Sequence, residues 1–388
     1  MTDGKVRLGI IGFGQQGPVY ARLIAEGRVP SMVVGAVADV DPAKKDKADE
    51  MGLPFFNSAE ELMDSGLVDA VVTTIPHYDH PAVGIAALER GLGTLIEKPA
   101  AVYTKQAEEL FACADAHPDV AFGIMFNQRT NQLYVDLKNL IESGELGKLR
   151  HTSWIITNWW RPDDYYGLSP WRATWGGEGG GVLVNQSPHQ LDLWQWLCGV
   201  PKKVFARLGF GFRRDIATED EVNAVVDFGD GASGHFMTCT HDAVGTDRLE
   251  ILLDAGKIVV DNSKDVTIYR LKDDERKLSA DIPWSKASKV LTGDFDQSQL
   301  YDIETKSYQS VWGEQHALAL ENFGQHMLTG AALIAPGRDG INGVKLANAM
   351  QLSAWTGEDV DMDNFDEQRY LDELNQRIRA EGDWPQRN

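Results

Sequence analysis

The chain has 388 residues, 43% hydrophobic and 24% charged, a composition typical of a folded protein rather than a disordered, collagen-like or coiled-coil one. Its 37 basic and 58 acidic residues give a net charge of −21, which repels phosphate backbones and anionic lipid, so we expect neither nucleic acid nor a membrane surface as partner. Three scattered cysteines, no signal peptide and no apolar run of membrane-spanning length predict a cytoplasmic protein.

The first third of the chain alternates short apolar segments with helical patterns. We expect strands over residues 6–11, 32–38, 70–75, 94–96 and 120–125, and helices over residues 16–26, 42–51, 81–90 and 104–116. This βαβα order predicts an α/β fold, in which a parallel sheet carries helices on both faces. We place this domain at residues 1–126.

The pattern changes near residue 126. A helix is expected over residues 132–143, followed by strands over 150–156, 204–212, 222–228, 233–239, 249–253 and 257–261, and by helices over 314–328 and 343–356. Neighbouring strands with short turns predict a mostly antiparallel sheet, so residues 127–388 are expected to form an α+β domain. The tail, residues 358–388, stands out by its charge alone, with ten acids and four bases.

A glycine-rich turn, Gly12-Phe13-Gly14-Gln15-Gln16-Gly17, follows the first strand and opens the first helix. Such a turn lets backbone N–H groups approach a pyrophosphate at the positive end of the helix. Asp39 ends the second strand, where its carboxylate is placed to accept hydrogen bonds from an adenosine ribose; a solvated acid is the alternative. Neither Asp39 nor Val40 suits a 2′-phosphate, so we expect NAD rather than NADP.

Glu97-Lys98-Pro99 follows the expected strand at residues 94–96. It therefore lies at the carboxyl edge of the sheet, where open α/β sheets bind ligands. Lys98 is a candidate to orient a substrate hydroxyl and to stabilise a developing alkoxide, and the alternative is a surface lysine.

Three glycines at residues 179–181 lead to Asn185 and then to Ser187-Pro188-His189-Gln190-Leu191-Asp192. Ser187 suits an N-cap and Pro188 the first helical position. His189 then lies in the first turn, where the helix dipole disfavours the protonated imidazole, so a neutral His189 suits a general base. A structural histidine is the alternative.

Together these motifs resemble the Gfo/Idh/MocA family of sugar and polyol oxidoreductases, and the segment 68–72 with Pro76 and His80 is similar to the family's cofactor loop. The resemblance extends over residues 5–356. It implies a Rossmann dinucleotide-binding domain, a C-terminal α+β domain with a large open sheet, and hydride transfer with a nicotinamide cofactor. It also implies that Pro76, His80, Glu97 and Lys98 contact the cofactor and that the sheet builds a homodimer or homotetramer.

The resemblance implies Lys98 and His189 as catalytic residues, with His189 as proton acceptor. Many members have an aspartate four residues before this histidine, where this chain has Asn185, and Ser187 replaces a glycine. An amide cannot accept a proton, so Asn185 is expected to position the substrate. Asp192 either orients His189 or is a solvated helix residue, and both readings remain open.

Seven of the eleven tryptophans lie between residues 154 and 196. Flat apolar rings beside polar groups suit sugars, and the alternative is that Trp154, Trp159 and Trp194 are core residues. Arg161 and Arg172 are candidates to bind a carboxylate or phosphate, and the alternative is that they pair with Asp163, Asp164 or Glu178. The candidate substrate-binding residues are Lys98, Asn127, Arg129, Trp159, Arg161, Tyr166, Trp171, Arg172, Trp175, Asn185, His189 and Asp192.

The sequence therefore predicts an NAD-dependent dehydrogenase acting on a secondary alcohol of a sugar, inositol or anhydrosugar. One alternative is a glycosidase that oxidises its substrate transiently with bound NAD. Another is a non-catalytic sugar or NAD sensor, which the presence of both Lys98 and His189 disfavours. No metal site is expected, because His77, Asp79 and His80 fall in the cofactor loop.

Overall fold

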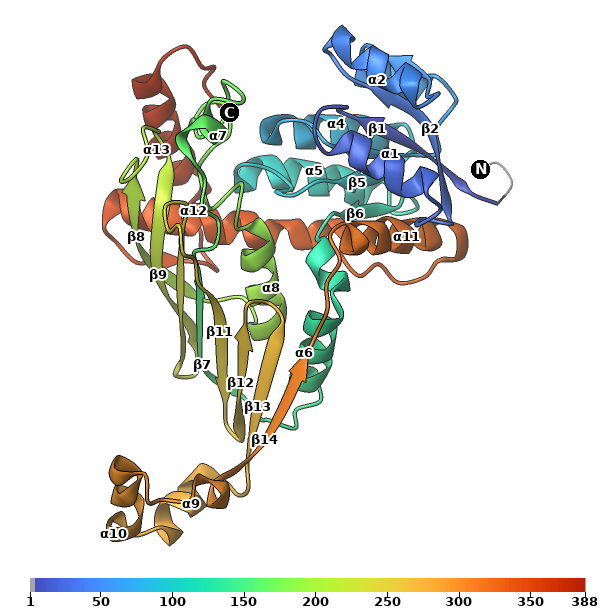
Figure 1. The fold of residues 1–388 in the computed structure, drawn as a ribbon. Coiled ribbons are helices and arrows are strands. Elements are labelled where there is room, and N and C mark those ends of the chain that lie inside the picture. The colour runs from blue at the N-terminus through green and yellow to red at the C-terminus, as the bar shows by residue number, and fades with distance from the viewer. Residues whose placement is uncertain (1–3, 388) are drawn as a thin grey trace.

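The structure is a computed structural model that describes residues 4–387, and its strands form two sheets (Figure 1). The first sheet has six parallel strands in the order β3-β2-β1-β4-β5-β6. These strands are β1 (Val6–Ile11), β2 (Met32–Ala38), β3 (Phe55–Phe56), β4 (Ala70–Thr73), β5 (Gly93–Ile96) and β6 (Phe122–Ile124). The strand order is that of a Rossmann domain, which confirms the prediction for this part of the chain.

Helices cover both faces of the six-stranded sheet. They are α1 (Gly17–Ala25), α2 (Lys45–Glu50), α3 (Ala59–Asp64), α4 (His80–Glu89), α5 (Thr104–Ala116) and, from the second half of the chain, α11 (Glu314–Thr329). Helices α1 and α11 share one core cluster with the sheet, in which Tyr20 and Phe323 are buried. Helices α3 and α4 meet the sheet in another cluster through Leu62 and Ala87. The domain boundary at residue 126 stays a prediction.

The second sheet has nine strands in the order β14-β13-β12-β11-β7-β10-β9-β8-β15. The strands are β7 (Leu149–Ile156), β8 (Lys203–Phe210), β9 (Glu219–Gly229), β10 (Ala232–Cys239), β11 (Asp247–Leu253), β12 (Gly256–Asp261), β13 (Asp265–Leu271), β14 (Tyr301–Ser307) and β15 (Val360–Asp361). Every neighbouring pair is antiparallel except β7 and β10. The prediction of a mostly antiparallel sheet is confirmed.

One face of the nine-stranded sheet carries the helices of the second core. These are α6 (Gln132–Glu142), α8 (Pro188–Cys198), α12 (Gly340–Thr356) and α13 (Glu367–Glu381), and they contribute to a single large cluster of buried side chains. Helix α12 also sends Val344 into a core cluster of the first domain, beside Ile96 and Leu110. It therefore joins the two halves of the molecule, as its position in Figure 1 shows.

The elements that were not expected from the sequence include α3, α13, β13 and β14. The acidic tail forms α13, whose apolar side chains Tyr370, Leu371, Leu374 and Ile378 are buried. Strand β14 has no buried residue, so it lacks the alternation that marks a half-buried strand. Within residues 4–387, no helix is both long and apolar enough to cross a membrane.

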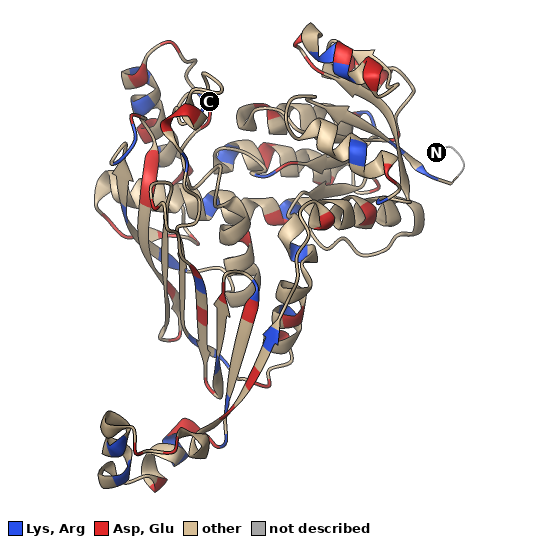
Figure 2. Cartoon of the chain, viewed as in Figure 1, with Lys and Arg blue, Asp and Glu red and all other residues tan. Residues whose placement is uncertain are grey.

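Between β13 and β14 the chain makes an extension, residues 272–300, that projects beyond the end of the sheet (Figure 1). It contains α9 (Glu275–Asp281) and α10 (Trp284–Ala287), and neither helix buries a residue. Trp284 is 75% exposed and Leu291 79% exposed. Charges of both signs lie along the extension (Figure 2).

A buried ion pair fixes the start of α8. Arg129 donates from Nε to Asp192 Oδ2 at 2.9 Å and from Nη2 to Asp192 Oδ1 at 2.6 Å. Its Nη1 donates to Asp339 Oδ2 at 2.6 Å. Arg129 is 3% exposed and Asp192 2% exposed, so the guanidinium ties α8 to the segment before α12 from inside the protein.

We expect Arg129→Met to lower the free energy of unfolding by about 3–5 kcal/mol, because it leaves the Asp192 carboxylate buried without its partner. Urea unfolding of the variant and the wild type measures the difference. Arg129→Met with Asp192→Leu should recover most of the loss, since no charge then remains buried. Arg248→Met is the control, because Arg248 is exposed and its ion pairs are worth about 1 kcal/mol or less. A loss for Arg129→Met as small as that of the control would contradict this account.

Candidate active site

The glycine turn at the end of β1 has two glycines that the chain itself requires and one that leaves open space. A Cβ at Gly12, where φ is 94°, would lie 2.4 Å from the Thr74 carbonyl oxygen, and one at Gly17 would lie 2.2 Å from the Gly12 carbonyl oxygen. A Cβ at Gly14 would meet no atom within 4 Å. Exposed backbone at Gly14 and Gln15 therefore faces open space at the N-terminus of α1, which fits a dinucleotide phosphate.

The Asp39 carboxylate is held at the edge of this turn. Its Oδ2 accepts a hydrogen bond from Phe13 N at 2.7 Å, and its Oδ1 accepts one from Asp41 N at 2.9 Å. Asp39 is half-buried, and each of its oxygens keeps a lone pair for a further donor. This placement is compatible with ribose binding, which stays a prediction.

Lys98 is not a surface lysine, because it is half-buried and tied to both halves of the molecule. Its Nζ donates to the backbone carbonyl oxygen of Asn185 at 2.9 Å, and its backbone N donates to Glu97 Oε2 at 3.0 Å. Glu97 Oε1 accepts from the Tyr20 hydroxyl on α1. Burial lowers the pKa of the Lys98 ammonium, and the negative charges of Glu97 and Glu178 oppose that shift.

Two histidines lie near Lys98. Burial, Lys98 and His316 hold the pKa of His189 well below its usual range, so its imidazole is neutral at pH 7. Burial lowers the pKa of His316, in the first turn of α11, to about 4. Nδ1 of each ring is buried with no hydrogen-bond partner. The sequence did not single out His316.

The side chain of Asn185 contacts a buried carboxyl. Its Nδ2 donates to Glu178 Oε1, and Glu178 Oε2 accepts from Ala173 N at 2.6 Å. Glu178 is 2% exposed, and burial raises its pKa to about 7. The sequence named Glu178 only as a partner for the arginines, and neither Arg161 nor Arg172 forms an ion pair with it or with any other carboxylate in residues 4–387.

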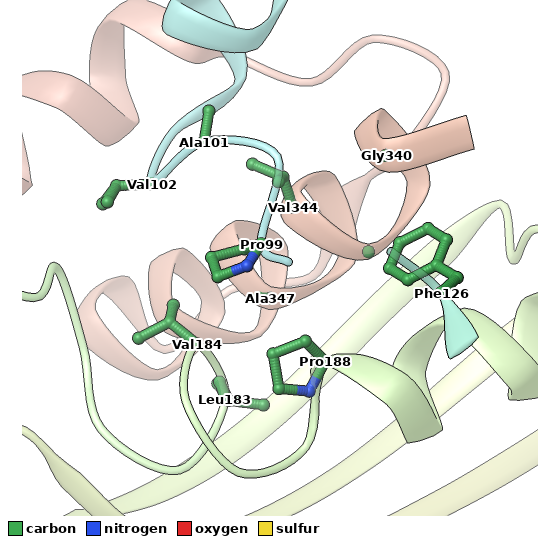
Figure 3. A pocket seen from close by; sticks show the side chains of 11 residues that line it. Pro99, Ala101, Val102, Phe126, Leu183, Val184, Pro188, Gly340, Val344 and Ala347 are labelled. Carbon is green, nitrogen blue, oxygen red and sulfur yellow. The ribbon is translucent and has the colours of Figure 1, made fainter. Parts of the chain in front are cut away.

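Neighbours of these polar groups in the sequence form an apolar seam (Figure 3). It surrounds a cavity of about 10 Å³, which is smaller than any ligand, and its lining residues are Pro99, Ala101, Val102, Phe126, Leu183, Val184, Pro188, Gly340, Gly343, Val344 and Ala347. Pro99 follows Lys98 and Pro188 precedes His189, so the seam holds the two candidate catalytic residues together against α12. Pro188 occupies the first helical position as predicted, whereas Ser187 Oγ donates to the Val182 carbonyl oxygen instead of capping α8.

Aromatic side chains of residues 159–175, here called the aromatic segment, pack with arginines and with His77. Trp171 meets His77 edge-on at 5.8 Å between ring centroids. The Arg172 guanidinium lies 4.6 Å from the centroid of Tyr165, and that of Arg161 lies 5.2 Å from the same ring. Tyr166 and Arg172 line a cavity of about 520 Å³ together with Asp163, Gly167, Ala173, Thr174, Asp215, Ile216, Ala217 and Glu381. This cavity is large enough for a small molecule.

Several expected site residues are placed elsewhere. Arg129 and Asp192 bind each other, so the expectation that they contact substrate or orient His189 is wrong for this structure, and Asp192 is not solvated either. Trp175 is 4% exposed and packs on Trp355, which makes it a core residue like Trp154 and Trp194. Asn127 is 1% exposed. Trp159 is half-buried and packs against the core.

His80 lies behind the site rather than facing it. Its Nδ1 is 2.8 Å from the Pro99 carbonyl oxygen and its Nε2 is 3.0 Å from the Ile75 carbonyl oxygen. The ring is 1% exposed and burial lowers its pKa to about 4, so it supports the loop that carries Lys98 instead of offering a group to the cofactor. Pro76, in contrast, is exposed. Within the described part of the chain, no three His, Cys, Asp or Glu side chains are arranged to hold a metal ion.

Two family models match the chain. Residues 6–124 match the model described as "Oxidoreductase family, NAD-binding Rossmann fold", and residues 134–259 match the "GFO/IDH/MocA C-terminal domain". Among curated relatives, the rhizopine catabolism protein MocA of Rhizobium meliloti is 27% identical over 59% of this chain and 70% of its own length. The NADP-dependent scyllo-inositol 2-dehydrogenase IolW of Bacillus subtilis is 24% identical over 90% of this chain and 94% of its own.

Solved structures share the fold over nearly the whole chain. The WlbA dehydrogenase of Bordetella pertussis, in complex with NADH and UDP-GlcNAcA, has a TM-score of 0.78 and 23% identity, and covers 93% of this chain and 99% of its own. A levoglucosan dehydrogenase in complex with NADH and levoglucosan has a TM-score of 0.75 and 20% identity, and covers 92% and 99%. Each comparison extends across both sheets.

We expect Leu183→Ala to lower the free energy of unfolding by about 2–5 kcal/mol, because it enlarges the cavity in the apolar seam. Leu183 is 1% exposed. Thermal or urea unfolding measures the loss. The matched control is Leu318→Ala on α11, where the side chain is 47% exposed and a change within about 0.5 kcal/mol is expected. Equal losses in the two variants would show that the seam contributes no more than a surface position.

Proposed function

We propose, because this chain belongs to the Gfo/Idh/MocA family of NAD-binding oxidoreductases, that it oxidises a secondary alcohol of a sugar, an inositol or an anhydrosugar. The observation that carries this proposal is the contact between Lys98 and Asn185, which brings the end of β5 to the segment that starts α8. This backbone contact, together with the electrostatic effect of Lys98 on His189, supports a site built from both domains. Relatives that act on scyllo-inositol or bind levoglucosan support this substrate class.

The glycine turn at residues 12–17, Asp39 and the exposed Pro76 would hold the dinucleotide. Bound NAD supplies the hydride acceptor. Lys98 donates a hydrogen bond to the reacting oxygen and stabilises its negative charge as the alkoxide develops. His189 is neutral and accepts the hydroxyl proton, since burial and the nearby Lys98 keep it unprotonated at pH 7. Asn185 orients the substrate by hydrogen bonding.

Lys98→Met and His189→Ala should each lower the turnover number by at least about 100-fold, because general base catalysis and electrostatic stabilisation contribute that much or more. NADH formation is followed with inositols, aldoses and anhydrosugars, with NAD and NADP in parallel. Binding of NAD, measured by calorimetry, should persist in the His189 variant. The exposed Lys105→Met is the control and should retain wild-type turnover. Unchanged turnover in either variant refutes the assignment, and hydrolysis of a nitrophenyl glycoside without NADH formation would identify a glycosidase instead.

We also infer that copies of the chain associate through the uncovered face of the nine-stranded sheet. The paired residues Phe205 and Val225 lie on this face, and they are 41% and 55% exposed. Leu252 is 43% exposed on β11 and lies on the same side by strand register. Exposed apolar side chains on a sheet face that no helix covers support a partner there. The three free cysteines support a reducing, cytoplasmic setting.

Val225→Glu should convert the oligomer to a smaller species, because it places a carboxylate in the middle of the proposed interface. Light scattering coupled to size exclusion measures the mass. Val244→Glu is the control, since Val244 is 96% exposed in the loop before β11. A monomeric wild type, or an unchanged mass for Val225→Glu, would rule out this face as the contact.

A further inference from the structure

Glu178 is a buried carboxyl that the proposed mechanism does not use. It lies in the turn ahead of the glycine run and is 2% exposed. Both of its oxygens are engaged by N–H donors, Oε2 by Ala173 N at 2.6 Å and Oε1 by Asn185 Nδ2. Its carboxyl therefore connects the end of the aromatic segment to Asn185.

Asn185 is held at three points, which leave its side-chain Oδ1 free. Its backbone N donates to the Gly181 carbonyl oxygen at 3.0 Å. Its carbonyl oxygen accepts from Lys98 Nζ at 2.9 Å, and its Nδ2 donates to Glu178. Asn185 is partly exposed, and its Oδ1 accepts no hydrogen bond from residues 4–387. The Oδ1 atom is thus the polar end of this side chain that a ligand can reach.

An amide has a donor end and an acceptor end, whereas an ionised carboxylate only accepts. The partner of an asparagine therefore decides which way its amide points. We propose that Glu178 is a positioning residue that fixes the Asn185 amide with Oδ1 toward the substrate. The pair then presents a hydrogen-bond acceptor to a substrate hydroxyl, as an aspartate would. The negative charge stays on Glu178 instead of on residue 185. This inference rests on the proposed function, because it concerns the same site.

Glu219 provides the contrast that separates positioning from a structural role. It is also fully buried, and its Oε1 accepts from Gly181 N at 2.8 Å and from Leu183 N at 3.2 Å. Burial raises its pKa to about 7, as it does for Glu178. It forms hydrogen bonds with the segment that begins with the three glycines at residues 179–181 and with Gln351, but none with the Asn185 side chain. Loss of this carboxylate should disturb the same segment without turning the Asn185 amide.

The test is a polarity swap. In Glu178→Gln the new side chain has one oxygen, which can accept from Ala173 N, and its NH₂ then faces Asn185. The Asn185 amide therefore turns its Oδ1 toward this NH₂ and presents its own NH₂ to the substrate. In Asn185→Asp two carboxyls are in contact. We expect each substitution to lower kcat/KM by at least about tenfold at about pH 8. In the double variant the glutamine NH₂ donates to the new carboxylate and every donor has an acceptor again, so kcat/KM recovers by about tenfold or more over either single variant.

The same variants are compared by thermal midpoint, without substrate. Glu178→Gln and Asn185→Asp should each lower the midpoint. The double variant should lose less than the sum of the two single losses. Glu219→Gln is the matched control, for which adding Asn185→Asp gives additive losses in both measurements. Scyllo-inositol and levoglucosan are the kinetic probes, together with any alcohol that the NADH screen identifies.

Failure of the proposed function and failure of this inference give different results. If the wild type oxidises none of the alcohols, the proposed function fails, and the thermal comparison alone decides whether Glu178 fixes the amide. Additive thermal losses overturn the inference. Thermal recovery without kinetic recovery also overturns it, because the pair then exists without presenting an acceptor to the substrate.

Discussion

The packing of Pro99 and Pro188 against α12 is the contact on which the arrangement of the site depends. Lys98 follows β5 of the parallel sheet and His189 lies in α8 of the second domain, so no single element sets their separation. Their neighbouring prolines line one apolar seam, whose cavity of about 10 Å³ leaves almost no free space. Because close-packed interiors resist displacement, apolar contacts determine where the polar atoms meet. Hydrogen bonds such as that from Lys98 to Asn185 then complete a geometry already set by packing.

Carboxyls near the site, half-buried at Glu97 and buried at Glu178 and Glu219, hold other groups in place. Glu97 accepts from Tyr20 and from the Lys98 backbone, Glu178 from Ala173 and Asn185, and Glu219 from the glycine run. A carboxylate without such donors would be costly to bury. Each of these acids therefore fixes a backbone turn or a side chain that lies closer to the ligand. The acidity of this chain has an internal role as well as an effect on its surface.

The sequence was sufficient to predict both sheets because their buried strands leave clear patterns. Apart from Arg7 in β1, every residue of β1 and β4 is buried and most are apolar, as expected for strands covered on both sides. Strand β14 has no apolar face, so it has no such pattern. Helix α13 does place Tyr370, Leu374 and Ile378 at helical spacing, but its many acids obscure them. Boundaries moved by one to three residues where caps and turns compete with the apolar pattern.

Lys98 and His189 could be predicted as candidates because each lies inside a short local motif. Residues that act through distant partners were missed or misassigned. Arg129 and Asp192 are 63 positions apart, and an arginine after a strand has the same local sequence whether it meets a ligand or an acid. His316 reaches the site only because α11 returns to the first sheet. Glu178 has a partner only seven positions away, but the turn that joins them has no regular spacing from which contact could be inferred.

The extension at residues 272–300 has a consequence for how the chain can be altered. Leu271 and Tyr301 pair at the last rung of the β13–β14 ladder, so the extension connects two positions that already lie opposite each other. A hairpin turn of about two residues bridges such a pair. Since neither of its α-helices buries a residue, the segment can be exchanged for a short turn, or for an inserted fluorophore-bearing domain, without opening the core. The far end of the sheet is thus a natural attachment point, well removed from the chemistry.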